Sequence, residues 1–282
     1  MILFKKEKDL KPELKRLQNQ GKTIAFAPTM GALHNGHLEL IRAGKLAGHT
    51  TVVSIFINPT QFNDKKDFEK YPVTIEQDIK LLVESGTDIL FLPSVAEMYP
   101  DGLEALSRYD LGDLENLLEG HYRPGHFQGV CNVMHRLLKK IEPQHLYMGQ
   151  KDYQQCMVVQ KLIADFQLPV QFHVVPTIRE ESGLAMSSRN TRLSQNAREN
   201  AVAIYHAHVY VKNNLLKLSL RDLKDNAKKQ LKAAGFTEID YIEICDAHTL
   251  QPVQAYHEDQ QLVILTAAFT EGVRLIDNML LN

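Results

Sequence analysis

The chain has 282 residues, of which 44% are hydrophobic and 23% charged, so it can bury a core and exceeds one average domain. Its 32 Lys and Arg residues nearly balance its 34 Asp and Glu residues, which does not favour nucleic acid or an acidic membrane as a partner. No apolar run approaches the ~18 residues of a membrane span. The segment from Met1 to Lys8 becomes charged too early for a signal peptide, so we expect a soluble, cytoplasmic protein.

The three cysteines, Cys131, Cys156 and Cys245, lie far apart in the sequence and form no CxxC pair. None has histidine or cysteine neighbours at the spacing of zinc ligands. The sequence therefore predicts neither a disulfide framework nor a structural metal site.

Short apolar runs alternate with helical patterns through the first 176 residues. Strands are predicted at 24–28, 51–57, 88–92, 145–148 and 170–176, and helices at 37–47, 74–85, 129–141 and 152–166. Strands that alternate with helices favour a parallel sheet covered on both faces. We therefore predict an α/β fold with a Rossmann-like domain over residues 1–176, which would bind the ligands.

The pattern changes after Arg189. Long polar helices are predicted at about 194–216 and 220–234, and strands at 241–245, 262–269 and 273–276. Helices followed by strands favour a smaller α+β domain. We expect this second, C-terminal domain to span residues 177–282 and to close over the ligand-binding site of the first domain.

The segment from Pro28 to His37, PTMGALHNGH, joins the first predicted strand to the helix that follows it. Open α/β sheets bind ligands at the carboxyl ends of strands, where free backbone N–H groups and the helix dipole favour an anion. His34 and His37 are three residues apart, so both imidazoles should project to one side and donate to phosphate oxygens. By itself this spacing also fits a simple turn, shaped by Gly31 and Gly36, before a helix.

A second polar cluster, GQKDYQQ at 149–155, follows another predicted strand and should lie at the same edge of the sheet. Lys151 would bring a point charge to phosphate, and Asp152 would cap the helix or hold a ribose hydroxyl. An ordinary helix cap with a solvated lysine is the alternative. The shared edge favours a ligand.

The segment AMSSRN at 185–190 combines two hydroxyls with a guanidinium. Ser187, Ser188 and Arg189 would form a phosphate clamp, because arginine binds phosphate through two parallel hydrogen bonds. A polar loop between domains is the alternative. Three clusters of phosphate-binding type in one chain favour the clamp.

Neutral amides follow the second predicted strand, at Asn58 and Gln61. They suit a hydroxylated substrate because an amide donates and accepts hydrogen bonds without a charge. Pro59 makes a turn with solvated amides an alternative. Arg123 adds a cation in a loop, where a surface role fits equally well.

Together these clusters resemble the pantothenate synthetase (pantoate:beta-alanine ligase) family of the HIGH-motif nucleotidylyltransferase superfamily. The matching stretches cover nearly the whole chain in order: PTMGALHNGH (28–37), SIFINPTQF (54–62), YP (71–72), LEGHYRPGHFQGV (118–130), GQKDYQQ (149–155), GLAMSSRN (183–190) and RLIDN (274–278). Gln150 stands where many family members carry Glu, and His121 and Tyr122 stand where smaller residues are common.

The resemblance implies a reaction in two steps. The pantoate carboxylate attacks the α-phosphorus of ATP and releases pyrophosphate, and beta-alanine then attacks the bound pantoyl adenylate to give pantothenate and AMP. Mg²⁺ would accompany ATP because a triphosphate is highly charged. The family usually forms a homodimer through its larger domain, so we expect a homodimer.

The resemblance also implies the roles of individual residues. His37 is the position that the family treats as a proton donor, although an imidazole that only donates a hydrogen bond also stabilises charge when pyrophosphate leaves. We expect the catalytic residues to be His37, His34, Lys151 and Arg189. The implied ATP ligands are Met30, Gly31, Ala32, Leu33, His34, Asn35, Gly36, His37, Gly149, Gln150, Lys151, Asp152, Ile178, Met186, Ser187, Ser188 and Arg189. Pantoate would be bound by Gln61 and Gln155, with Asn58 and Arg123 as further members of its site.

Two other functions fit parts of this pattern. A pantetheine-phosphate adenylyltransferase or a cytidylyltransferase would keep the loop with His34 and His37 but bind a phosphorylated acceptor. Such an acceptor needs cationic residues, whereas Asn58 and Gln61 are neutral amides. A nucleotide-binding regulatory module would not need donors around the α-phosphorus. We therefore predict an enzyme that adenylylates a small hydroxylated carboxylic acid.

Overall fold

The computed structural model describes residues 1–63 and 65–282. The chain divides into two compact units: Met1–Gln150 with Gln154–Pro176, and Lys151–Tyr153 with Thr177–Asn282. The short segment Lys151–Tyr153 therefore groups with the C-terminal part of the chain. None of the helices in the described ranges combines the length and hydrophobicity that crossing a membrane requires.

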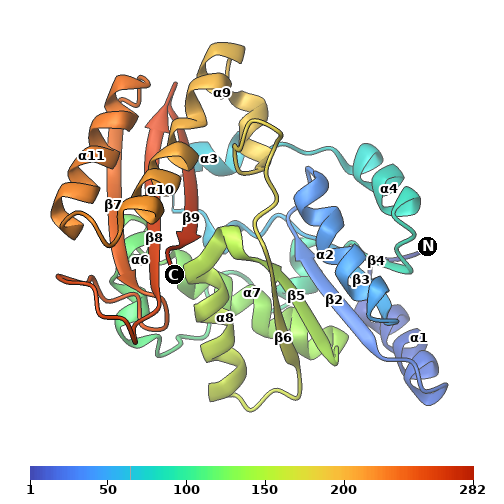
Figure 1. Cartoon of the computed structure of the whole chain (residues 1–282). Coiled ribbons are helices and arrows are strands. Elements are labelled where there is room, and N and C mark those ends of the chain that lie inside the picture. Colours follow the sequence, from blue (N-terminus) through green and yellow to red (C-terminus); the bar gives the residue numbers. More distant parts are fainter. Residues whose placement is uncertain (64) are drawn as a thin grey trace. The chain divides into compact units, whose positions relative to one another are not determined.

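A six-stranded parallel sheet forms the centre of the first unit (Figure 1), in the order β1-β4-β3-β2-β5-β6. Its strands are β1 (Ile2–Phe4), β2 (Ile24–Thr29), β3 (Thr50–Ile55), β4 (Ile89–Phe91), β5 (His145–Gly149) and β6 (Gln171–Val175). Because the chain runs from β2 to β3 in one direction and reaches β5 on the other side of β2, the strand order reverses there. Open α/β sheets bind ligands beyond the carboxyl ends of the strands at such a reversal.

Helices and short turns connect these strands. The helices are α1 (Glu7–Asn19), α2 (Asn35–Leu46), α3 (Lys65–Glu69), α4 (Ile75–Glu84), α5 (Val95–Met98), α6 (Leu118–Tyr122), α7 (His126–Ile141) and α8 (Tyr153–Asp165), and the 3-10 turns are η1 (Pro59–Gln61), η2 (Gly112–Glu115) and η3 (Gln150–Asp152). Successive residues of β2 face opposite sides, so Phe26 packs with α7 whereas Ala25 and Ala27 pack with α2.

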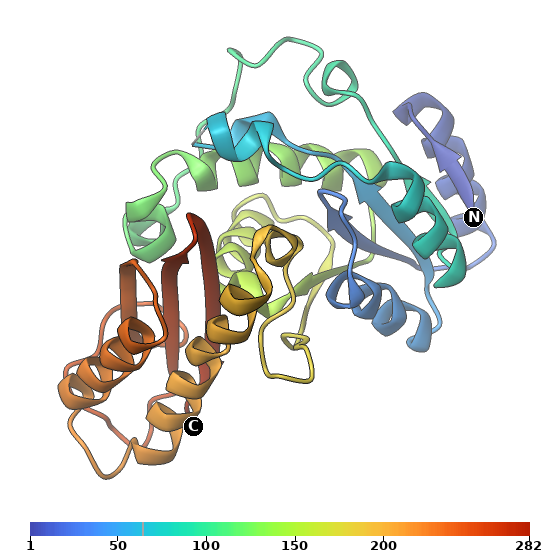
Figure 2. The ribbon, with the colours of Figure 1, turned by 90° about the horizontal axis from the view of Figure 1, so that it is seen from above.

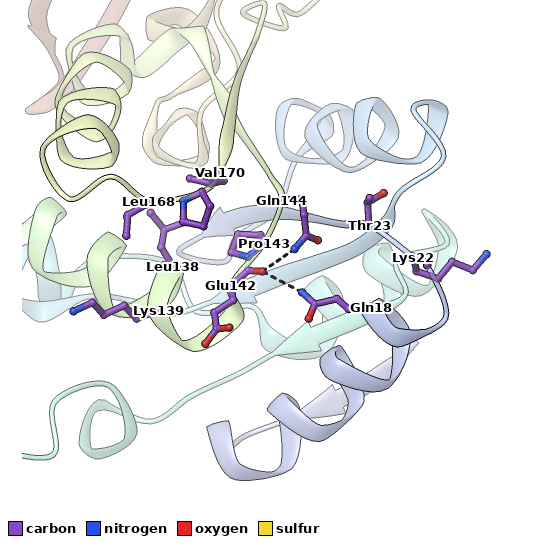
Figure 3. A pocket seen from close by; sticks show the side chains of 12 residues that line it. Gln18, Lys22, Thr23, Leu138, Lys139, Glu142, Pro143, Gln144, Leu168 and Val170 are labelled. Carbon is purple, nitrogen blue, oxygen red and sulfur yellow. Dashed lines mark hydrogen bonds between the residues drawn. The ribbon is translucent and has the colours of Figure 1, made fainter.

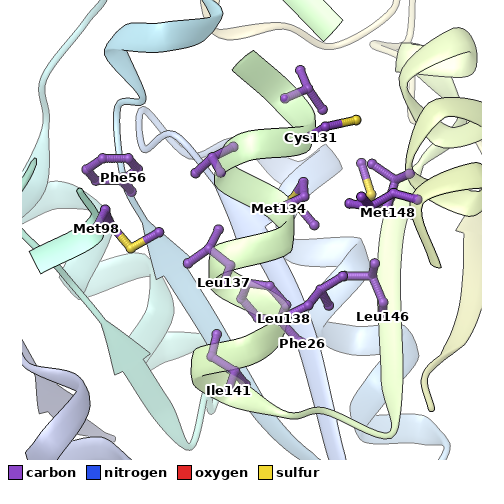
Figure 4. Close-up of a cluster of buried hydrophobic side chains, with 14 of the residues drawn as sticks. Phe26, Phe56, Met98, Cys131, Met134, Leu137, Leu138, Ile141, Leu146 and Met148 are labelled. Carbon is purple, nitrogen blue, oxygen red and sulfur yellow. The ribbon is translucent and has the colours of Figure 1, made fainter. Parts of the chain in front are cut away.

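Helix α7 covers one face of the sheet and is buried along most of its length (Figure 4). Leu138 of this helix lies in one apolar cluster with Phe26 of β2 and Leu146 of β5. Gly129 permits a close approach to η1, because a Cβ atom at this position would lie 2.2 Å from the carbonyl oxygen of Thr60. The packing of α7 therefore fixes the turn that follows β3.

The second unit contains a three-stranded antiparallel sheet in the order β7-β8-β9, with α10 and α11 along one side (Figures 1 and 2). Its elements are the 3-10 turn η4 (Ser188–Arg192), the helices α9 (Gln195–Ala201), α10 (Ala203–Asn214) and α11 (Leu220–Ala233), and the strands β7 (Glu238–Asp246), β8 (Leu262–Thr270) and β9 (Val273–Leu280). Val211 of α10 and Leu223 of α11 pack against Ile244 and Ile264 of the sheet.

The predicted α/β class, Rossmann-like parallel sheet and smaller α+β part are confirmed. Three helix predictions need correction. The helix predicted at 129–141 starts three residues earlier, at His126. The helix predicted at 194–216 is interrupted at Val202, where ψ is −20° and α9 gives way to α10. The helix predicted at 152–166 starts at Tyr153, after η3.

Candidate active site

The loop between β2 and α2, which we call the histidine loop (Pro28–His37), places its two imidazoles side by side. Nδ1 of His34 accepts a hydrogen bond from the backbone of Gly36 at 3.2 Å, and Nδ1 of His37 accepts one from the backbone of His34 at 3.3 Å. The two ring centroids are 4.1 Å apart. A ring nitrogen that accepts carries no proton, so each neutral ring carries its proton on Nε2. The start of α2 thereby sets both rings as Nε2 donors.

A buried carboxylate on α4 determines the shape of the same loop. Asp78 is 1% exposed, and its two oxygens accept hydrogen bonds from the backbone of Ala32 at 2.9 Å and of Leu33 at 2.8 Å. Gly31 and Ala32 have φ angles of 85° and 49°, in the left-handed region that only a strongly held turn imposes on alanine. Asp78 was not among the predicted site residues. The available signal was an acid in helical register with Leu82 on the apolar face of α4.

The expectation of free N–H groups in this loop is wrong for residues 31–34. Gly31 donates to the hydroxyl of Thr29 at 3.2 Å, Ala32 and Leu33 donate to Asp78, and His34 donates to His37. The turn and the Asp78 carboxylate of α4 together pair these donors, and an unpaired backbone group in a buried loop would be unfavourable. The backbone N–H groups of residues 31–34 are therefore paired within the protein.

The turn after β3 is built around the amide of Asn58, which is 1% exposed. Its nitrogen donates to Oε1 of Gln61 at 3.0 Å and to the carbonyl of Gly129 at 3.2 Å, and its oxygen accepts from the Tyr99 hydroxyl at 2.7 Å. Burial raises the pKa of Tyr99, so the hydroxyl remains protonated and can donate. Both N–H groups of Asn58 are thus used within the protein, and the residue orients Gln61.

Gln61 links this turn to the histidine loop and to Arg123. Its Nε2 lies 3.1 Å from the sulfur of Met30, and its backbone carbonyl oxygen lies 2.8 Å from Nδ1 of His126. Nε2 of His126 lies in turn 3.2 Å from a guanidinium nitrogen of Arg123. Met30, Asn58, Gln61 and Arg123, predicted from three separate segments, therefore form one connected group in the first unit.

The residues of the GQKDYQQ segment (149–155) lie in three different elements. Gly149 ends β5, Gln150 opens η3, and Gln155 is partly exposed on α8. Lys151 has its Nζ 3.8 Å from the carboxylate of Asp152, and its backbone carbonyl accepts a hydrogen bond from Asn278 at 2.8 Å. Asn278 was not among the predicted site residues, because its partner lies 127 positions away.

The segment that leads into η4 and includes its first two residues, which we call the clamp segment (Ile178–Arg189), folds back on itself. The backbone of Met186 donates to the carbonyl of Ile178 at 3.0 Å, which closes the base of a turn. The hydroxyl of Ser187 then accepts from the backbone of Arg189 at 3.2 Å and caps η4. The predicted residues Ile178, Met186, Ser187, Ser188 and Arg189 are therefore gathered in one short region of the second unit, and the last four are partly exposed.

A pocket of about 700 Å³ opens elsewhere in the first unit (Figure 3). Thr23, Gln144 and Val170 line it, and these residues directly precede β2, β5 and β6. The pocket therefore lies at the amino ends of the strands and contains none of the predicted site residues. Within residues 1–63 and 65–282, no three His, Cys, Asp or Glu side chains are arranged to hold a metal ion.

Comparisons with known proteins agree with the predicted resemblance. A sequence model of the pantoate-beta-alanine ligase family matches residues 2–280. The chain is 42% identical to the pantothenate synthetase of Cytophaga hutchinsonii, with 100% of this chain and 99% of that protein covered, and 40% identical to that of Aquifex aeolicus, with 98% of each covered.

Solved structures of similar proteins cover the chain completely. The pantothenate synthetase of Thermus thermophilus superposes with a TM-score of 0.91 at 37% identity, over 100% of this chain and 99% of that one. The pantoate-beta-alanine ligase of Francisella tularensis, solved in complex with beta-gamma ATP and beta-alanine, gives a TM-score of 0.81 at 37% identity, over 100% and 98%. The chain therefore belongs to the pantoate-beta-alanine ligase family, a family of enzymes.

Proposed function

We propose that this enzyme joins pantoate to beta-alanine in the cytoplasm, using ATP, through a pantoyl adenylate. A pantoate carboxylate oxygen would bond to the α-phosphorus while the bond from that phosphorus to the β-phosphate bridging oxygen breaks. The amine of beta-alanine would then attack the acyl carbon, AMP would leave, and the nitrogen would lose a proton. Family membership supports the overall reaction, and the ligands of the Francisella tularensis relative support ATP and beta-alanine as substrates.

The observation that carries the adenylylation step is the pair of imidazoles at the start of α2. Both rings are held with Nε2 as the donor nitrogen, and fixed donors stabilise the charge that develops on phosphate oxygens without reorganising during the reaction. We propose that His34 and His37 act in this way. Pyrophosphate is a good leaving group, so His37 need not transfer its proton.

The remaining phosphate and nucleotide contacts are also part of the proposal. Lys151 and Arg189 would neutralise phosphate charge. The further ATP ligands would be Met30, Gly31, Ala32, Leu33, Asn35, Gly36, Gly149, Gln150, Asp152, Ile178, Met186, Ser187 and Ser188. Because the loop N–H groups from Gly31 to His34 are already paired, we expect backbone contacts in this part of the loop to be made by carbonyl groups and by van der Waals packing.

For pantoate we propose Gln61 and Gln155 as direct ligands. The amide of Gln61 is oriented by Asn58, and an amide suits a hydroxyl and a carboxylate because it both donates and accepts. Asn58 itself would act through Gln61, since its own N–H groups are already used. Arg123 would support the same turn through His126.

Mg²⁺ would enter with ATP. It prefers oxygen ligands and keeps several waters, so phosphate oxygens suit it better than the imidazoles and amines of this site. The carboxylate of Asp78 is engaged with the backbone of the histidine loop. We also propose that residues 1–176 bind ATP and pantoate, that residues 177–282 close over them, and that the enzyme is a homodimer.

The test is a product assay with purified protein, ATP, Mg²⁺, pantoate and beta-alanine. We expect equal amounts of AMP, pyrophosphate and pantothenate, with pyrophosphate release that depends on pantoate. Pyrophosphate release that required a phosphorylated acceptor would favour another nucleotidylyltransferase. The absence of AMP with all substrates present would favour a regulatory nucleotide-binding module.

A further inference from the structure

Strand β9 carries two adjacent buried polar side chains, Asp277 and Asn278, which are 4% and 2% exposed. Consecutive residues of a strand point to opposite sides, so one strand can serve two partners. Asp277 contacts the clamp segment, and Asn278 contacts Lys151. Neither residue belongs to the proposed ligand set.

The contact of Asp277 is an ion pair with Arg179. The two guanidinium nitrogens lie 2.6 and 3.0 Å from the two carboxylate oxygens, and one also donates to the carbonyl of Gly183 at 3.2 Å. The guanidinium lies over the ring of Tyr205 at 4.6 Å. Such a two-pronged, stacked arginine has a single orientation. It attaches the turn that leads into Ser187 to strand β9.

The contact of Asn278 is with Lys151, one of the two proposed phosphate-binding cations. Its Nδ2 donates to the backbone carbonyl of Lys151 at 2.8 Å. Lys151 lies in the single 3-10 turn that precedes α8, where few regular helical hydrogen bonds are available to hold the backbone. The amide of Asn278 therefore helps to fix the point from which the Lys151 side chain starts.

We infer that Asp277 and Asn278 are positioning residues. Asp277 attaches the clamp segment to strand β9, and Asn278 attaches the backbone of Lys151 to the same strand. The two proposed phosphate-binding cations, Lys151 and Arg189, thereby keep a fixed spacing. The inference rests on the proposed function. Asn278 acts through Lys151 and does not contact substrate. Because pantoate is assigned to residues of the first unit, loss of Asn278 should affect ATP use and leave the pantoate KM unchanged.

The experiment is a double-mutant cycle with Asn278→Ala and Lys151→Ala, read by the single-turnover rate of pantoate-dependent pyrophosphate release. We expect Asn278→Ala to lower the rate roughly tenfold, the scale of one lost buried hydrogen bond that positions a reacting group. In the Lys151→Ala background the same substitution should change the rate by less than about twofold, because the side chain it positions is gone.

Asn282→Ala is the matched control. The amide of Asn282 also donates to a backbone carbonyl, that of Gln260 at 2.7 Å, just beyond the end of the same strand, but it does not contact Lys151. We expect its rate to stay within about twofold of the wild type. If Asn278→Ala does not fold by circular dichroism, Asn278→Ser replaces it in the same cycle.

If the effects of Asn278→Ala and Lys151→Ala on the single-turnover rate multiply in the double variant, the inference is wrong. It is also wrong if Lys151→Ala keeps the wild-type rate. An increase in the pantoate KM equal to that for ATP would also overturn the inference, because it would indicate general loosening. These failures differ from failure of the proposed function, in which the wild-type enzyme itself would release no pyrophosphate with pantoate.

Discussion

The histidine loop and the clamp segment are each closed by a buried carboxylate, but the donors differ. Asp78 accepts hydrogen bonds from backbone N–H groups of the histidine loop, at Ala32 and Leu33. Asp277 binds the clamp segment through one side chain, the guanidinium of Arg179. The histidine loop therefore contacts its carboxylate through two backbone donors that every residue type except proline supplies, and the clamp segment contacts its carboxylate through a single charged side chain.

This difference affects how each loop should tolerate change. A charge removed from a buried ion pair leaves its partner uncompensated, which costs more than the loss of a hydrogen bond between a carboxylate and neutral donors. A substitution at Asp277, which binds the clamp segment, should therefore lower the stability of the protein more than a substitution at Asp78, which binds the histidine loop. Four measurements test the two loops and the residues around their carboxylates.

The largest effect is expected for Asp277→Ala. It would leave the guanidinium of Arg179, only 18% exposed, without its carboxylate, and the free energy of unfolding should fall by about 3–5 kcal/mol. Urea unfolding followed by circular dichroism measures this. The double variant Asp277→Leu/Arg179→Met should recover much of the loss. A double variant as unstable as Asp277→Ala would mean that packing, and not the unpaired charge, causes the effect.

Acid should weaken the same region through His208. This residue is fully buried near Asp277, and burial lowers its pKa to about 4. Between pH 6.5 and about 4 the unfolded chain binds a proton that the folded chain does not, so stability should fall as pH is lowered, by roughly 3 kcal/mol in all. Unfolding of His208→Gln at pH 7 and pH 4.5 checks this. If the stability difference from the wild type is the same at both pH values, His208 does not contribute the pH dependence.

His37→Ala tests whether an imidazole of the histidine loop stabilises charge during adenylylation. Losing a positioned donor should lower the single-turnover adenylylation rate by roughly 10²-fold or more, without changing the melting temperature by more than a few degrees. His206→Ala, at an exposed histidine of the second unit, is the control and should retain the wild-type rate. An unchanged rate for His37→Ala would remove this residue from the mechanism.

Asp78→Asn should destabilise the protein less than Asp277→Ala does. One amide oxygen can still accept from the loop, while the amide nitrogen faces a second N–H group, so we expect a loss of about 2 kcal/mol. The variant should keep its fold and lose part of its adenylylation rate, because the histidines follow the turn directly. If it is destabilised as much as Asp277→Ala, the proposed contrast between the two loops is wrong.

The sequence predicted the central strands and the loops at their carboxyl ends because apolar runs and glycine-containing turns are local signals. Helix α1 escaped prediction, since its only buried side chains are Leu10 and Leu14 and the rest of its pattern is charged. Residues 151–153 were expected to lie in the first domain. They group with the second unit, which holds them through Asn278.

The anchors of the candidate site were not predictable in the same way. Asp78 and Asp277 have partners 45 to 98 positions away, and one sequence does not tell which acid becomes buried. Asn58 was predicted as a member of the pantoate site. Its contacts favour an indirect role, because Tyr99 and Gly129 occupy the groups that a substrate would need.

The most direct test of the adenylate route uses pantoate labelled with ¹⁸O in its carboxylate. If that oxygen attacks the α-phosphorus and the acyl bond later breaks at the carbonyl carbon, one labelled oxygen must leave with AMP. Mass spectrometry of the products should therefore find AMP carrying one ¹⁸O and pyrophosphate carrying none. Unlabelled AMP, or label in pyrophosphate, would contradict a pantoyl adenylate and with it the role proposed for the histidine loop.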